Sequence, residues 1–202
     1  MSDTNGPHPT ERDPRRLFEF IALTARLRDI ERPNNATPLR KESVAEHSWH
    51  LALVSWILHA EFEREAGYRI DLTKMLKMCL MHDLVEIDAM DATDATDVTA
   101  RFASLPGALG FELLELWHEY EEGSTPEACL VRGVDRLNPA LMRYLTGQGW
   151  HDMAIDSHAP VDAEALDRQQ LPRVQVSGTL RALYEEIRNA SVASGLLPSH
   201  AP

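Results

Sequence analysis

Residues 43–67 read SVAEHSWHLALVSWILHAEFEREAG, and this stretch predicts a long helix with one apolar face. Ser43 is a typical N-cap, and Glu46 lies three residues later, where a glutamate completes a capping box. Gly67 suits the left-handed residue that follows many helices. Apolar side chains recur between these signals at helical spacing, at Leu51, Val54, Leu58 and Phe62.

The same spacing recurs along the chain, whereas alternating strand patterns do not. Asp13-Pro14 opens the first predicted helix, and the loop-forming residues Pro33, Asn34, Asn35 and Pro38 predict a loop over residues 30–42. The fold class is therefore predicted to be all-α. Further helices are expected over residues 71–84, 111–120 and 125–145, from Asp162 to just before Pro172, and over 177–193, with Pro139 kinking or breaking the third of these.

Length and composition predict one domain. The 202 residues suit one helical domain over residues 13–195, with tails at 1–12 and 196–202. The net charge of −12 makes nucleic-acid polymers and anionic membranes poor partners. No apolar run is long enough to span a membrane, the first 14 residues lack a signal-peptide core, and two cysteines form no disulfide framework, so a cytoplasmic location is expected.

A scattered set of histidines and aspartates carries the strongest chemical signal. Imidazole and carboxylate groups together suit a divalent transition metal. His47 falls early in one predicted helix, His82-Asp83 late in the next, and Asp135 in the middle of the helix over 125–145. Packing these three helices together could bring the four side chains to one point.

A single His-Asp pair means little, because about 0.6 such pairs are expected by chance from this composition, and His151-Asp152 is interpreted as a chance pair. His82 and Asp83, however, lie within an apolar helix, where a buried charge needs a partner or a metal. Glu86 lies on the same helical face and could move protons, and Asp91 follows just beyond the helix.

Two arginines precede His47. Arg32 and Arg40 lie in the predicted loop, and an arginine fork suits a phosphate group. Taken alone, each is more often a surface residue than a ligand-binding one.

Together these residues resemble the HD-domain metal-dependent phosphohydrolases, and within them the 5′-deoxynucleotidase-like branch. The resemblance covers about residues 15–150 in order and spacing. The matching stretches are ESVAEHS at 42–48, HDLVE at 82–86 continuing to Asp91, VDRLNP at 134–139 and YLTG at 144–147.

The resemblance implies an HD-type helical bundle with a single metal site between helices. The ligands would be His47, His82, Asp83 and Asp135, with Glu86 and Asp91 as the acidic catalytic pair. Arg32, or Arg40 as a second candidate, would bind the phosphate of a small substrate, a (deoxy)nucleotide above all. It also implies a homodimer and one divalent ion, with manganese, cobalt, magnesium, iron, zinc and nickel all open.

Three other functions are compatible with part of this residue pattern. An HD-type di-iron oxygenase needs more histidines between Asp83 and Asp135 than the single His118. A cyclic-dinucleotide phosphodiesterase or an alarmone hydrolase shares much of the ligand set, and the short chain, with no attached regulatory domain expected, argues against both. A non-catalytic protein that binds metal or nucleotide is the third alternative, and it is disfavoured because all four ligand positions are filled.

Overall fold

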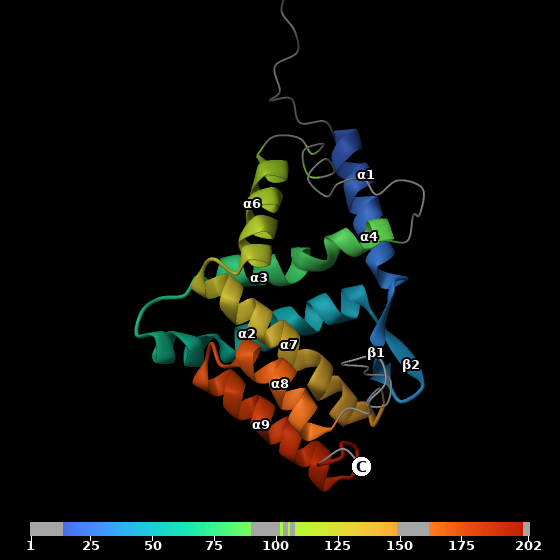
Figure 1. Cartoon of the computed structure of the whole chain (residues 1–202). Helices are drawn as coiled ribbons and strands as arrows, with labels where there is room; N and C mark the ends of the chain where they lie inside the picture. Colours follow the sequence, from blue (N-terminus) through green and yellow to red (C-terminus); the bar gives the residue numbers. More distant parts are fainter. Residues whose placement is uncertain (1–13, 90–101, 103–104, 106–107, 149–161, 200–202) are drawn as a thin grey trace, which may run out of the picture.

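Helices dominate the architecture, as Figure 1 shows for the computed structural model, and the all-α prediction is confirmed. The structure describes residues 14–89, 102, 105, 108–148 and 162–199. The helices are α1 (Pro14–Thr24), α2 (Val44–Ala66), α3 (Leu72–Met81), α4 (Glu86–Ala89), α6 (Leu109–Glu122), α7 (Pro126–Thr146), α8 (Ala163–Val174) and α9 (Gly178–Ala193), with 3₁₀ turns at Ala25–Arg28 and His82–Val85.

A small antiparallel hairpin replaces the loop predicted over residues 30–42. Strand β1 (Glu31–Thr37) pairs with β2 (Arg40–Ser43), and the register shifts twice along the pair. In a two-stranded sheet every strand is an edge, so Pro33 can face outward without removing a hydrogen bond between the strands. The prolines and asparagines in this segment predicted a loop, because the pairing of β1 with β2 depends on the opposite strand and not on local sequence.

The predicted end signals of α2 are confirmed. Ser43 Oγ accepts a hydrogen bond from the backbone N–H of Glu46 at 3.2 Å, and Glu46 Oε2 accepts one from the backbone N–H of Ser43 at 2.9 Å. Gly67 follows the helix at φ 73°, a left-handed conformation that glycine adopts without steric cost. This rigid start fixes the position of His47 in the first turn of α2.

Two prolines lie inside helices that were expected to stop or break there. Pro139 lies within the continuous α7, and Pro172 lies in the last turn of α8, which runs on to Val174. Each proline removes one helical hydrogen bond, yet both helices continue past it. For Pro139 the carbonyl left without its helical partner is that of Asp135, four residues earlier.

Helix α7 lies at the centre of the molecule. It packs against α2, α3, α6, α8, α9 and β1, and Figure 1 shows it crossing between α2 and the α8–α9 pair. Its buried side chains join those of the surrounding helices in one apolar core. The core includes Leu51, Met75, Met78, Val131, Val134, Leu166, Leu180 and Tyr184.

The C-terminal boundary differs from the prediction. Leu197 is 1% exposed, and the carbonyl of Pro198 accepts a hydrogen bond from the N–H of Ala163 at the start of α8. The described part of the expected 196–202 tail therefore belongs to the domain, while residues 1–12 and 200–202 lie outside the described ranges. Among the described helices, none combines the length and apolar character needed to cross a membrane.

Candidate metal centre

The structure brings the four predicted metal ligands together from three elements. His47 comes from the first turn of α2, His82 and Asp83 from the 3₁₀ turn after α3, and Asp135 from the middle of α7. His47 and His82 are buried, whereas the side chains of Asp83 and Asp135 keep 14% and 16% of their surface exposed. The site is therefore anchored in the core and opens toward solvent through its carboxylates.

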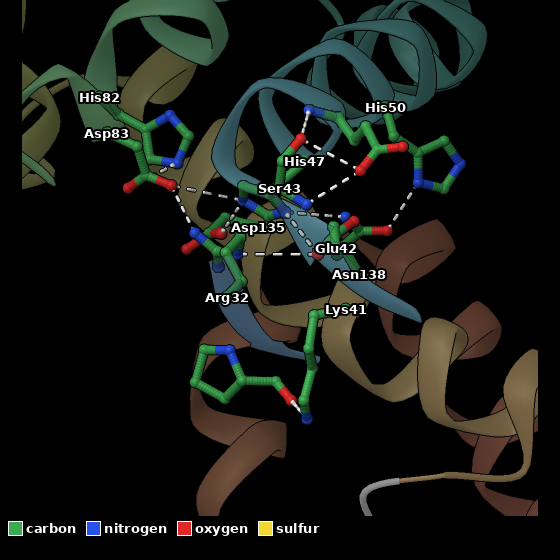
Figure 2. A network of polar contacts seen from close by, with 12 residues as sticks. Arg32, Lys41, Glu42, Ser43, His47, His50, His82, Asp83, Asp135 and Asn138 are labelled. Carbon is green, nitrogen blue, oxygen red and sulfur yellow. Dashed lines mark hydrogen bonds and ion pairs between the residues drawn. The ribbon is translucent and has the colours of Figure 1, made fainter. Parts of the chain in front are cut away.

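The distances between donor atoms suit a shared cation (Figure 2). His47 Nε2 lies 3.1 Å from Asp135 Oδ1 and 3.9 Å from Asp83 Oδ2, and His82 Nε2 lies 3.2 Å from Asp83 Oδ1. One ligand atom from each of His47, His82 and Asp83 lies within 4.8 Å of the other two. Two imidazoles and two carboxylates form a donor set that divalent transition metals accept.

The contacts of the two ring nitrogens of His82 show that a cation fits between His82 and Asp83. Its Nδ1 lies 3.0 Å from the carbonyl oxygen of Cys79, which can only accept, so Nδ1 carries the proton. In the neutral ring, the buried Nε2 then presents a lone pair to Asp83 Oδ1 at 3.2 Å. Two facing acceptors require a positive charge between them, either a proton or a metal ion. The residues therefore fit a metal centre.

The carboxylates are held in their charged form. Burial alone would raise the pKa of Asp135, but the hydrogen bond with His47 and the charges of His82 and His47 outweigh it and lower the pKa to about 2. For Asp83, burial is likewise outweighed by His82, Arg32 and His47, and its pKa is lowered. Both side chains are therefore anionic at neutral pH, as a metal ligand would need to be.

A buried polar network supports the rear of the His47 ring. Asn138 Nδ2 lies 3.0 Å from His47 Nδ1, and Asn138 Oδ1 lies 2.8 Å from His50 Nδ1 (Figure 2). Glu42 is 2% exposed, and its Oε2 lies 3.8 Å from His47 Nδ1. Asn138 had no predicted role, although it follows Asp135 by three residues, within one turn of the same helix.

Tyr120 is a second residue of the site without a predicted role. Its hydroxyl donates a hydrogen bond to Asp135 Oδ2 at 3.3 Å, and its ring lies 5.1 Å from that of His82. Burial, together with the charges of Asp135 and Asp83, raises the pKa of Tyr120, so its hydroxyl remains a donor. No spacing pattern marks a tyrosine on a different helix as a neighbour of Asp135.

The two predicted phosphate-binding arginines occupy different places. Arg32 on β1 lies at the centre, where Nη1 donates to Asp83 Oδ2 at 2.5 Å, and its Nε lies 3.7 Å from Glu42 Oε2. Arg40 on β2 instead forms a bidentate pair with Glu46, at 2.8 and 2.7 Å, on an exposed surface. The structure thus brings Arg32, and not Arg40, to the metal ligands.

The acidic pair is described only in part. Glu86 begins α4 and lines the cavity that the metal ligands open into, together with Arg32 and Tyr120. Asp91 lies outside the described residues. His118, the one histidine between Asp83 and Asp135, is exposed on α6 and does not join the site.

The comparison with protein families agrees with this geometry. The sequence profile of the HD domain matches residues 24–172, which include all four predicted metal ligands. The chain belongs to the HD-domain family. The helical fold described above is that of an HD domain, and the oxygenase and binding-protein alternatives are not favoured.

Individual relatives of this HD domain carry related names. A 5′-deoxynucleotidase HDDC2 from Dictyostelium discoideum is 32% identical over 144 residues, 63% of this chain and 75% of its own length. The human protein of that name is 26% identical over 135 residues, 63% of this chain and 66% of its own. A crystal structure of a predicted metal-dependent phosphohydrolase from Magnetospirillum magnetotacticum superposes with a TM-score of 0.76 at 30% identity, covering 93% of this chain and 100% of that one.

Proposed function

We propose that this HD domain hydrolyses the phosphate ester of a small phosphorylated substrate, a (deoxy)nucleotide. The enzyme class is the HD-superfamily metal-dependent phosphohydrolase. The observation that carries the substrate proposal is that His82, Asp83, Asp135 and Arg32 line one cavity, with the buried His47 in contact with Asp135. The names of the relatives support the nucleotide part of the proposal.

The reaction adds one water across a phosphorus–oxygen bond. The water oxygen joins the phosphorus, the bond to the alcohol oxygen breaks, and the alcohol leaves with a proton. A bound divalent metal supplies Lewis acidity, which lowers the pKa of water and offsets charge on the phosphoryl group. Glu86 takes the proton from the attacking water, and Asp91 is the alternative acid–base residue.

Arg32 positions the phosphate. Its guanidinium is already oriented by Asp83 and Glu42, so little side-chain freedom is lost when it binds the oxygens of the substrate. We propose one divalent ion per chain, held by His47, His82, Asp83 and Asp135, with manganese, cobalt, magnesium, iron, zinc and nickel as candidates. A donor set of two imidazoles and two carboxylates is compatible with each of these ions.

The oligomeric state, the location and the partners of the protein are also proposed. We infer a cytoplasmic homodimer without a nucleic-acid or membrane partner, from the family resemblance and from the charge of −12. Sedimentation velocity at micromolar concentration is expected to give one species of twice the 22.7 kDa chain mass. A single species at the chain mass would contradict the dimer.

The decisive experiment measures phosphate release from a panel of nucleoside mono-, di- and triphosphates. The protein is treated with EDTA and then reloaded with manganese, cobalt or magnesium, beside Asp135→Ala. Asp29→Ala is the matched control, because Asp29 is an exposed aspartate outside the cavity. We expect metal-dependent turnover in the wild type and the control and a loss of more than about 100-fold in Asp135→Ala. Folded, metal-loaded protein that releases no phosphate would contradict the function.

A second variant separates proton transfer from metal binding. Glu86→Gln is expected to lower kcat by about 10²- to 10⁴-fold with unchanged metal content, because glutamine cannot accept the proton. Full activity of Glu86→Gln at saturating metal would show that Glu86 does not handle the proton, and Asp91→Asn is then the variant to compare.

A further inference from the structure

Three arginines gather on one wall of the metal-centre cavity. Arg132 and Arg136 lie four residues apart on α7, so they share a face of that helix, and Arg173 lies near the end of α8. All three line the same cavity as Asp83 and Asp135, and its volume of about 690 Å³ is in the range of small-molecule sites. Arg136 directly follows the ligand Asp135 in sequence.

The three guanidinium groups differ in how they are held. Arg132 is anchored, because its Nη1 donates to the carbonyl oxygens of Tyr120 at 2.7 Å and Glu121 at 2.5 Å. Arg136 and Arg173 are exposed, and within the described residues neither forms an ion pair with a carboxylate. Among the described residues, these two arginines thus line the cavity without a salt bridge, although the charge of Asp135 acts on both.

The charges around Arg173 are mainly positive. The charge of Arg136 is the largest cause that lowers the pKa of Arg173, followed by burial and by the charge of Arg132, while Asp135 opposes them. Glu121 and Glu122 also line the cavity, at the end of α6, but neither pairs with any of the three arginines in the described part of the chain. Like charges held close together are unfavourable, and a bound anion would relieve this repulsion.

We propose that Arg132, Arg136 and Arg173 bind a second phosphoryl group of the substrate, while the first lies at the metal centre. This proposal rests on the proposed function. A guanidinium fork matches two phosphate oxygens, and the neighbouring ligand Asp135 places this subsite beside the reacting phosphorus. The substrate class is therefore a small molecule with two phosphoryl groups, either adjacent, as in a diphosphate, or on separate hydroxyls, as in a bisphosphate.

The kinetic test compares substrates with one and two phosphoryl groups. We would measure kcat/KM for a nucleoside 5′-monophosphate, the 5′-diphosphate and the 3′,5′-bisphosphate. The wild type is expected to prefer one of the two doubly phosphorylated substrates by about tenfold or more. The Arg136→Gln/Arg173→Gln double variant is expected to lose this preference. The identity of the preferred substrate tells whether the second group is adjacent or separate.

The matched control is Arg168→Gln/Arg181→Gln. These arginines are exposed and each pairs with a glutamate four residues away on its own helix, outside the cavity. The control is expected to keep the wild-type preference. Equal kcat/KM for all three substrates in the wild type, or a preference that survives in the double variant, would overturn the subsite.

A binding measurement does not depend on turnover. Titration calorimetry with inorganic pyrophosphate on EDTA-treated protein isolates the arginines from any metal. Pyrophosphate binding that is at least about tenfold weaker in the double variant than in the control supports the subsite. If no substrate is hydrolysed at the same time, only the proposed function is contradicted. Phosphate release with equal pyrophosphate binding in both variants overturns the subsite and leaves the function standing.

Discussion

Asn138 holds the imidazole of His47 from behind the metal centre. As placed, its Nδ2 faces His47 Nδ1 at 3.0 Å. A metal bound at His47 Nε2 requires the proton on Nδ1, and turning the Asn138 amide lets Oδ1 accept from that proton while Nδ2 donates to His50. In this orientation, the amide oxygen of Asn138 would orient the ring of a metal-bound His47.

We expect Asn138→Leu to weaken metal binding by about 10- to 100-fold, because His47 would lose the acceptor that orients its ring. Competition against a chromogenic chelator measures this affinity directly, and thermal unfolding shows whether the variant is folded. Asn189→Leu is the control, since Asn189 is exposed on α9. Metal affinity equal to the wild type in folded Asn138→Leu would refute the positioning role.

At the residue scale the sequence predicted which histidines and aspartates the structure brings together, but not the residues that contact them from behind. His47, His82, Asp83 and Asp135 are recognisable because imidazoles and carboxylates in apolar helices demand a partner. Tyr120 and Asn138 are neutral side chains, so their presence in a helix does not require a charged partner. Their roles depend on which helices pack face to face, which spacing along one helix does not reveal.

Glu65 joins the end of α2 to the start of α9. Its Oε2 accepts from Ser177 Oγ at 2.6 Å, and its Oε1 accepts from the N–H and Oγ1 of Thr179 at 2.7 and 2.6 Å. A carboxylate at the first turn of α9 also interacts favourably with the helix dipole. Although burial favours the neutral acid, these hydrogen bonds outweigh it and lower the pKa of Glu65.

We expect Glu65→Gln to lower the free energy of unfolding by about 1 kcal/mol at pH 7. Because the folded pKa is depressed, this contribution is present above the unfolded value of about 4.3 and is lost as pH falls through the folded pKa. Urea unfolding between pH 3 and 7 measures both variants. Glu61→Gln, which changes a surface pair within α2, is the control. A Glu65→Gln deficit that does not shrink toward pH 3 would contradict this account.

At the element scale, helix ends were predictable and the hairpin was not. Ser43, Asp71, Thr125, Asp162 and Ser177 each cap a helix through a side-chain oxygen. These signals are local, so they can be read from a few residues. The β1–β2 pairing and the continuation of α7 through Pro139 depend instead on tertiary contacts that override local preference.

The last described residues contribute to the stability of the whole domain. Leu197 is 1% exposed, and the N–H groups of Leu196 and Leu197 both donate to the carbonyl of Ser191. Deleting residues 196–202 is expected to cost about 2 to 4 kcal/mol, the range for losing one buried leucine and its hydrogen bonds. Deleting only 200–202 is the control. Equal urea midpoints for the two truncations would show that the segment 196–199 adds nothing.

Metal is expected to stabilise the folded chain, because its ligands come from α2, the 3₁₀ turn after α3, and α7. At 100 times its dissociation constant, an ion that binds only the folded state adds about 2.7 kcal/mol. Thermal unfolding should therefore shift upward when manganese or cobalt is returned to EDTA-treated protein, and Asp135→Ala should show little shift. An identical shift in Asp135→Ala would place the stabilising ion elsewhere.

Asp135 and Arg136 are consecutive residues of the central helix α7. An anion that binds Arg136 therefore acts on the same stretch of backbone as a metal ion that binds Asp135. Thermodynamic reciprocity then requires that the factor by which metal changes the affinity for a phosphorylated anion equals the factor by which that anion changes the affinity for metal. In a cell where free metal is scarce, abundant substrate would recruit the ion that its own hydrolysis needs.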